Sequence, residues 1–330
     1  MGGVALMRRM SIVFFLAGLF VAAWLFNGIN AAGVVRSIAS IGWGFILVLG
    51  VRVVLLYVDS HSWRLLLLAG VRPSLHLSAF QRWIGEGVTV LLPFASISGE
   101  LVRVRLAIVY GLRGAVAFAS IVMDAVVAVV SQIIFLGIGV ALYVSMGIGS
   151  DALRGSMGFA LIALLLAAGA MAMAIRGEWL GRFGKILKNV FSSSQASWLA
   201  EAMNSVDEQI AEITARRAAF LRSLLWRLLG WVLGAAEIAL VLYLLGKPIS
   251  LGEALMLDAL TTAVRTAFFF VPAGLGVQEG TLLLLGATLG IGGETMMAAA
   301  LIKRARELVF GLPAVLAWQW VEAERVEGKS

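Results

Sequence analysis

The stretch FVPAGLGVQE at residues 270–279 places a proline, two glycines and a glutamate inside an otherwise apolar part of the chain. The stretch LLPFASISGE at residues 91–100 has the same order of features. In both, a glutamate follows the proline by seven positions, and the two pairs are Pro93 with Glu100 and Pro272 with Glu279. The repeated pattern predicts two helices that are each broken by a loop and that occupy equivalent places in an internal repeat.

The surrounding sequence indicates a membrane protein. The chain has 330 residues, of which 61% are hydrophobic and 14% are charged, and its mean hydropathy is +0.98. We therefore expect an all-α, polytopic integral membrane protein with about six membrane-spanning helices and two re-entrant broken-helix hairpins. The expected spans are Ser11–Phe26, Ile41–Val58, Gly114–Val144, Ser156–Ile175, Phe220–Leu245 and Thr295–Trp320. The broken segments are Leu75–Ala107 and Ala254–Leu289.

Several kinds of chemistry are excluded or disfavoured by composition. The chain has no cysteine and two histidines, so thiolate chemistry is excluded and a histidine-rich metal site is not expected. No GxxxxGK[ST] loop is present, which argues against direct use of ATP. We expect no cofactor and no bound metal. The net charge of +7 is attributed to membrane topology and anionic lipid, so a nucleic-acid partner is not expected.

The distribution of lysine and arginine predicts the orientation of the chain. With a cytoplasmic N-terminus, the loop from Arg176 to Arg227 is also cytoplasmic and holds eight of the 26 basic residues. The three loops on the other side contain only Arg36, Arg154 and Lys247. This asymmetry fits the positive-inside rule and places both termini in the cytoplasm. The two hairpins then enter the bilayer from opposite faces, as in the inverted repeats of secondary transporters.

The expected organisation is a single transmembrane domain, residues 1–330, with a first repeat at 41–145 and a second at 220–320. Residues 176–219 form a cytoplasmic linker with an amphipathic helix. Its apolar residues recur at helical spacing, namely Leu199, Met203, Val206, Ile210 and Ile213. We interpret this helix as packing on its own protein or lying at the membrane interface, in preference to binding a partner.

Many charged residues lie in or near the apolar segments, where each charge facing lipid costs roughly 2.5–3.5 kcal/mol at a helix centre. Most must therefore face one another or water. In the last helix, Arg304 and Glu307 are three residues apart and can pair, whereas Lys303 and Arg306 share a face without a carboxylate in register. Such a cationic face favours an anionic head group, above all a phosphate.

The segments LLPFASISGELVRVRL, VPAGLGVQEG and LIKRARELVFGLPAVLAWQ resemble motifs of the lysylphosphatidylglycerol synthase transmembrane-region family, also called flippase-like membrane proteins. Within that family the chain is most similar to the hopanoid-biosynthesis-associated membrane proteins. The resemblance extends from about residue 10 to residue 320 and implies an integral inner-membrane protein that moves lipids between leaflets. In two-domain relatives a soluble aminoacyl-transfer domain follows. We do not expect the synthase activity here, because the chain ends ten residues after Trp320.

The resemblance carries over to specific residues. They are Pro93, Gly99, Glu100, Arg103 and Arg105 in the first hairpin, Pro272, Gly274, Gly276, Gln278 and Glu279 in the second, and Arg304, Arg306 and Glu307 in the last helix. The prolines and glycines are assigned to hairpin gating, and the other residues, with Arg265 and Lys303, to substrate binding. The family often has a Ser/Asn-containing stretch before the first proline, where this chain has Glu86, Gly87 and Thr89.

The predicted function is that of a flippase in the bacterial inner membrane, which moves an amphipathic lipid with a polar or anionic head group. A hopanoid, a phospholipid and a polyprenyl phosphate are candidate substrates, and lipid-biosynthesis enzymes are candidate partners. Glu86, Asp124 and Glu237 are candidates for proton coupling, and Glu100 and Glu279 either pair with arginines or titrate. The protein is predicted not to be an enzyme. The alternatives are a membrane-embedded transferase for lipid-linked substrates, which would need clustered aspartates, and an accessory scaffold, which would not need buried arginines.

Overall fold

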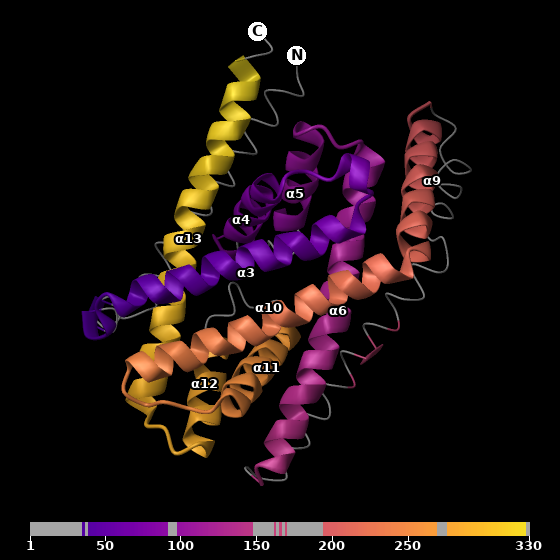
Figure 1. Cartoon of the computed structure of the whole chain (residues 1–330). Coiled ribbons are helices and arrows are strands. Elements are labelled where there is room, and N and C mark those ends of the chain that lie inside the picture. Colours follow the sequence, from indigo (N-terminus) through magenta and orange to yellow (C-terminus); the bar gives the residue numbers. More distant parts are fainter. Residues whose placement is uncertain are drawn as a thin grey trace. The chain divides into compact units, whose positions relative to one another are not determined.

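The computed structural model describes residues 35–36, 39–91, 98–147, 162, 165–166, 169, 194–268 and 276–327. Every regular element within these residues is a helix, which confirms the predicted all-α class (Figure 1). Three helices are long and apolar enough to cross a membrane, namely α3 (Gly44–Leu66), α6 (Gly114–Ser145) and α10 (Arg217–Leu244). Each of them overlaps a span predicted from the sequence.

The other predicted spans have different outcomes. Ser11–Phe26 lies outside the described residues, and only residues 162, 165, 166 and 169 of Ser156–Ile175 are described. Helix α13 (Gly293–Glu327) contains the whole of Thr295–Trp320, but it carries charged residues in the middle of that segment and is not among the uniformly apolar helices. The number of membrane spans stays a prediction.

Both broken segments are pairs of helices. The first consists of α4 (Leu75–Leu91) and α5 (Ser98–Val109), and the second of α11 (Leu251–Ala267) and α12 (Val277–Thr288). In each pair a helix of 17 residues is followed by one of 12 residues. Pro93, Pro272 and Gly274 lie between the helices, outside the described residues. Gly99 is already helical, within the first turn of α5.

The second helices of the two pairs also end in the same way. Gly111 and Gly290 both adopt positive φ, at 101° and 72°. The next residues, Leu112 and Ile291, each donate a backbone hydrogen bond of 2.9 Å to the carbonyl five residues earlier. This is the Schellman ending of a helix, and it requires a residue that tolerates positive φ. The glycines, the prolines and the glutamates of the two pairs are separated by the same number of residues along the chain.

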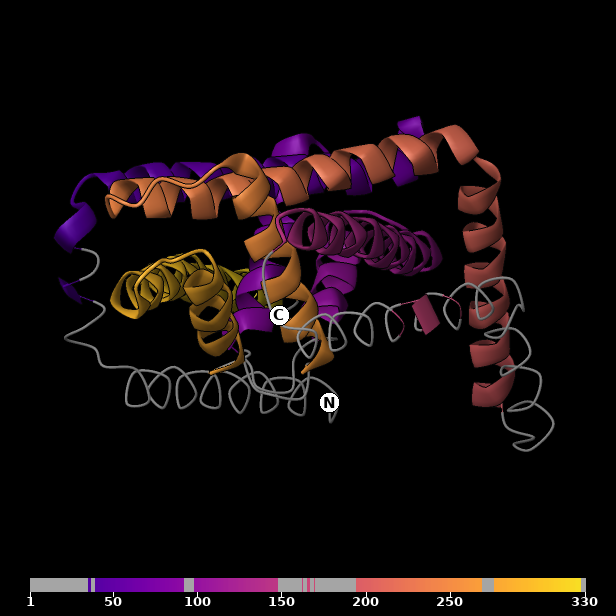
Figure 2. The ribbon, with the colours of Figure 1, turned by 90° about the horizontal axis from the view of Figure 1, so that it is seen from below.

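The chain forms two compact units whose boundaries cut across both segments predicted as repeats. The first unit comprises Met1–Val54, Phe80–Arg103 and Gly234–Ser330, and the second comprises Leu55–Ala79 and Val104–Leu233. In the second unit, the C-terminal part of α3 and the N-terminal part of α10 lie side by side in antiparallel directions (Figures 1 and 2). As α3 advances from Asp59 to Ser62, its contacts on α10 recede from Arg227 to Ser223.

Helix α9 (Ser194–Ala215) is the amphipathic helix expected in the linker. Within the second unit, Val206, Ile210 and Ile213 pack against Met123 and Val127 of α6. These three residues of the apolar stripe therefore face the protein itself, which agrees with the first of the two interpretations preferred from the sequence.

Small residues allow close helix packing in the first unit. A Cβ atom at Gly99 would lie 2.0 Å from Thr89 Oγ1 and 2.3 Å from the Gly85 carbonyl oxygen, so α4 and α5 touch through their backbones. Gly87 of α4 is similarly close to Ala314 of α13. Such small-residue contacts are typical of helix packing in membranes. They hold the first helix pair against the last helix.

Candidate functional site

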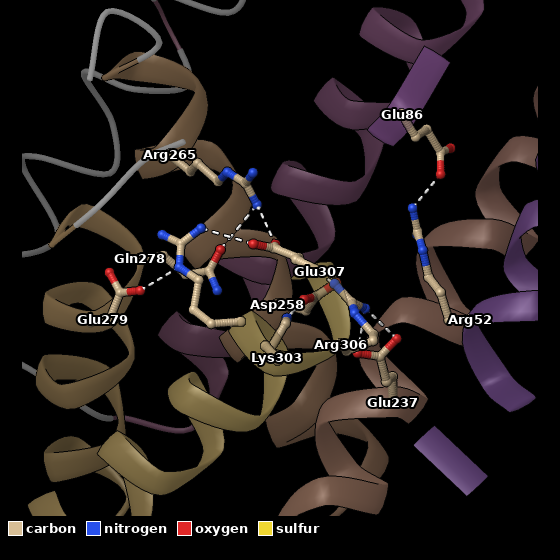
Figure 3. A network of polar contacts seen from close by, with 11 residues as sticks. Arg52, Glu86, Glu237, Asp258, Arg265, Gln278, Glu279, Lys303, Arg306 and Glu307 are labelled. Carbon is tan, nitrogen blue, oxygen red and sulfur yellow. Dashed lines mark hydrogen bonds and ion pairs between the residues drawn. The ribbon is translucent and has the colours of Figure 1, made fainter. Parts of the chain in front are cut away.

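Helix α13 presents its charged residues to three other helices of the first unit (Figure 3). Arg306 Nη1 donates to both carboxylate oxygens of Glu237 on α10 at 2.5 Å. Lys303 Nζ lies 3.1 Å from Asp258 Oδ1 on α11. Lys303 and Arg306 have no carboxylate in register on their own helix, as predicted, but the inference that they form an unpaired cationic face is wrong. Their partners come from other helices, which spacing along one helix cannot reveal.

Glu307 lies at the centre of the charged residues. Its Oε2 accepts a hydrogen bond of 2.8 Å from Arg304 Nη1, which confirms the pairing predicted from their spacing. Its Oε1 lies 3.3 Å from Arg265 Nη1 on α11 and 3.7 Å from Arg306 Nη2. One carboxylate thus holds three guanidinium groups, which would otherwise repel one another.

Glu279 connects the second broken segment to α13. Gly276, at φ 76°, precedes α12, and its backbone N–H donates to Glu279 Oε2 at 2.8 Å. The other carboxylate oxygen accepts a hydrogen bond of 2.7 Å from Arg304 Nε. A carboxylate in the first turn of a helix satisfies a backbone donor and interacts favourably with the helix dipole. Glu279 therefore fixes the start of α12 and ties it to Arg304.

Arg265 lies at the accessible edge of this group. Its side chain is 37% exposed, whereas those of Arg304 and Arg306 are 4% and 10% exposed. Arg265 Nη1 donates to Gln278 Oε1 at 3.0 Å, and Gln278 Nε2 is buried without a hydrogen-bond partner. The most accessible guanidinium is thus held partly by a neutral amide.

We call the eight ionised residues of this group the α13 network. They are Glu237, Asp258, Arg265, Glu279, Lys303, Arg304, Arg306 and Glu307. Four are cationic and four are anionic, so the network is neutral overall. Pairing offsets the high cost of placing isolated charges in a membrane helix. An added anion can bind this neutral network only if it displaces a group that already contacts one of the cations. The Gln278 amide oxygen, which accepts from Arg265, is the partner that an anion displaces most easily.

The first broken segment has separate ion pairs. Glu86 of α4 pairs with Arg52 of α3 and lies 3.9 Å from Arg82. Arg103 Nη1 donates to Glu100 Oε2 at 2.6 Å, and the Arg103 side chain is 3% exposed. Arg105 is exposed and belongs to the second unit, whereas the other predicted binding residues belong to the first. Arg52 was not predicted as a site residue, although it lies inside an apolar segment, where a charged residue indicates a polar partner or a functional site.

A further buried ion group lies in the second unit. Arg227 donates to Asp124 Oδ1 at 2.5 Å, and its Nη1 lies 3.1 Å from Asp59 Oδ2. The sequence predictions overlap at Arg227, which ends the expected cytoplasmic loop and also lies inside the expected span Phe220–Leu245. It is a buried residue of α10, 7% exposed, and the helix begins ten residues earlier at Arg217. Asp124, a proposed proton-coupling residue, thus belongs to a unit that does not contain Glu86 or Glu237.

The apolar helices and the charged residues buried among them define a multi-pass helical membrane protein. Comparison with known families gives its relationship: the chain belongs to the family described as the lysylphosphatidylglycerol synthase TM region, whose model matches residues 10–314. The family resemblance inferred from the three motifs is confirmed. No curated protein and no solved structure gave a match.

Proposed function

We propose that this protein is a lipid flippase of the bacterial inner membrane, which moves an amphipathic lipid with an anionic head group between leaflets. The observation that carries the proposal is the α13 network with Arg265 at its edge. The family, named for a lipid-modifying enzyme's membrane region, adds support for a role in lipid handling. Phospholipids, polyprenyl phosphates and hopanoids with an anionic head group are the candidate substrates.

Arg265 supplies the proposed contact with the head group. Its guanidinium is partly exposed, and one of its two contacts is to a neutral amide oxygen. A phosphate forms stronger, charge-assisted hydrogen bonds with arginine than an amide does, so it competes well for this donor. Glu307 then keeps the remaining guanidinium groups in place while the head group is bound. In this proposal Arg304 and Arg306 position the site and Arg265 contacts the lipid.

The two broken segments act as gates from opposite faces of the membrane. Their equal helix lengths, matching glycine endings and equivalent glutamates support an internal repeat. Helices α3–α6 and α10–α13 form two helix series, each with a broken segment in its middle. The antiparallel packing of α3 and α10, the first helices of the two series, supports inversion of one repeat relative to the other. Inverted repeats with discontinuous helices are the common architecture of alternating-access transporters. Both termini are placed in the cytoplasm by the positive-inside rule.

A translocation assay in liposomes tests the proposal. The purified protein is reconstituted without nucleotide, and the transfer of fluorescent phosphatidylglycerol and phosphatidylcholine between leaflets is measured by chemical quenching. We expect transfer of phosphatidylglycerol by the wild type and about tenfold slower transfer by Arg265→Gln, because a charged hydrogen-bonding group is lost. Arg113→Gln, an exposed change of the same charge in the other unit, is the matched control.

The outcomes separate the candidate functions. Equal rates for protein-free and protein-containing liposomes contradict a flippase, and formation of a covalent lipid product supports the transferase alternative. Equal rates for Arg265→Gln and Arg113→Gln remove Arg265 from the site. Slower transfer by both variants to the same extent indicates a general effect of surface charge and also contradicts the assigned role.

A further inference from the structure

A second group of arginines lies where the apolar spans α3 and α10 meet. Arg216 precedes α10 and donates to the carbonyl oxygen of Leu66, the last residue of α3. The ends of the two spans therefore coincide. We call four arginines at this place the interface arginines: Arg64, Arg72, Arg216 and Arg222. All four belong to the second unit and are distinct from the α13 network.

Three of the interface arginines, Arg64, Arg72 and Arg216, donate to backbone carbonyl groups, which are neutral. Arg72 Nε donates to the Leu67 carbonyl oxygen at 2.9 Å, and Arg64 Nε donates to the Pro73 carbonyl oxygen at 2.8 Å. The Leu67 carbonyl follows the end of α3, where helix carbonyl groups lack donors, and the Pro73 carbonyl lies in the loop before α4. Within the described residues, no aspartate or glutamate forms an ion pair with any of the four.

The local charge is therefore strongly positive. Burial and the neighbouring guanidinium groups of Arg216, Arg64 and Arg222 lower the pKa of Arg72, which lies outside the membrane-spanning segments. The end of α3 contributes only about half a negative charge, through the helix dipole. Among the residues that the structure describes, no carboxylate contact offsets the four positive charges. Structural capping accounts for the hydrogen bonds but leaves this excess of charge unexplained.

The residues around the group are apolar and exposed. The exposed fractions are 44% for Leu68, 44% for Val71, 55% for Leu221 and 57% for Leu225. A surface that combines arginines with exposed leucines at the end of a membrane span matches the chemistry of a phospholipid, whose phosphate lies beside its acyl chains. A soluble anion would gain nothing from the leucines.

We propose that the interface arginines bind the phosphate-containing head group of an anionic phospholipid, whose acyl chains lie against the neighbouring leucines. This lipid is a bound component of the second unit, separate from the lipid that the α13 network would transport. The phosphate of the bound lipid offsets part of the positive charge of the arginines and stabilises the junction between α3 and α10. The proposal does not depend on flippase activity.

The test measures the thermal stability of the full-length protein in detergent while lipid is added. The probes are phosphatidylglycerol, phosphatidylcholine and inorganic phosphate. We expect saturable stabilisation by phosphatidylglycerol alone, with about tenfold weaker apparent affinity in Arg222→Gln. Arg222 is suited to the test because it is exposed and provides none of the hydrogen bonds described above. Arg217→Gln is the matched control, since it removes the same charge from an exposed position in the first turns of α10.

Three results would overturn the proposal. Equal stabilisation by phosphatidylcholine excludes recognition of the negative head group. Equal weakening by Arg217→Gln and Arg222→Gln indicates diffuse attraction without a site. Stabilisation by inorganic phosphate that is lost in Arg222→Gln identifies an anion site that does not need lipid. Arg64→Lys, which keeps the charge, provides a second variant and should retain most of the phosphatidylglycerol response.

Discussion

Arg306 and Glu237 show that contacts between helices determine which buried charges form pairs. The Glu237 side chain is 1% exposed, and both of its oxygens accept from one guanidinium group. The two residues are 69 positions apart in the chain. The pairing of Arg304 with Glu307 was predictable because both lie on one helix. The pairing of Arg306 was not, because only the packing of α10 against α13 creates it.

The ion pair can be tested by a double-mutant cycle. Arg306→Ala should lower stability by about 3–5 kcal/mol, because it leaves the Glu237 carboxylate buried without a partner. Adding Glu237→Gln should recover much of that loss, since the stranded charge is removed. The measurement is thermal unfolding of the purified protein in detergent. Additive losses in the double variant would show that the two side chains do not act as a pair.

At the scale of helices, the sequence was most informative where its pattern was regular. Gly114–Val144 was predicted as a helix, and α6 is Gly114–Ser145. The two broken segments were predicted from their prolines and glycines, and both are helix pairs. Their packing was less predictable. Contacts such as Gly87 with Ala314 depend on which helices are neighbours, and an apolar membrane segment has no polar face to indicate this.

Two glycines of the second broken segment should respond differently to substitution. Gly276→Ala should destabilise the protein by about 1 kcal/mol or more, because its φ of 76° is unfavourable for a residue with a Cβ atom. Gly280→Ala is the control, since it lies within α12 and has nothing within 4 Å of its added Cβ. It should be neutral or stabilising. Thermal unfolding of both variants distinguishes them, and equal effects would contradict a special backbone role for Gly276.

At the scale of the whole chain, the two helix series share a plan although their charges differ. Both contain a long helix, helices of 17 and 12 residues, and a second long helix. Four basic and four acidic side chains of the α13 network come from the second series alone. In the proposed transport cycle, this difference in polar residues would give the two broken segments unequal roles.

The inverted arrangement can be tested by labelling with a membrane-impermeant thiol reagent. The chain has no cysteine, so single substitutions give no background. Ser98 and Val277 are the first residues of α5 and α12 and are equivalent in the two series. Ser98→Cys should label from the cytoplasmic side and Val277→Cys from the opposite side of sealed membranes. Labelling of both from one side would exclude an inverted repeat.

The neutrality of the α13 network also has a consequence for biosynthesis. Glu237, Asp258 and Glu279 leave the ribosome before α13, whereas their three cationic partners, Arg306, Lys303 and Arg304, belong to α13. Until α13 is made, the part of the network already synthesised has three carboxylates and one guanidinium, that of Arg265. We therefore expect the segment before α13 to be poorly accommodated by lipid until α13 follows it. Insertion of α13 supplies Lys303, Arg304 and Arg306, whose charges balance these carboxylates.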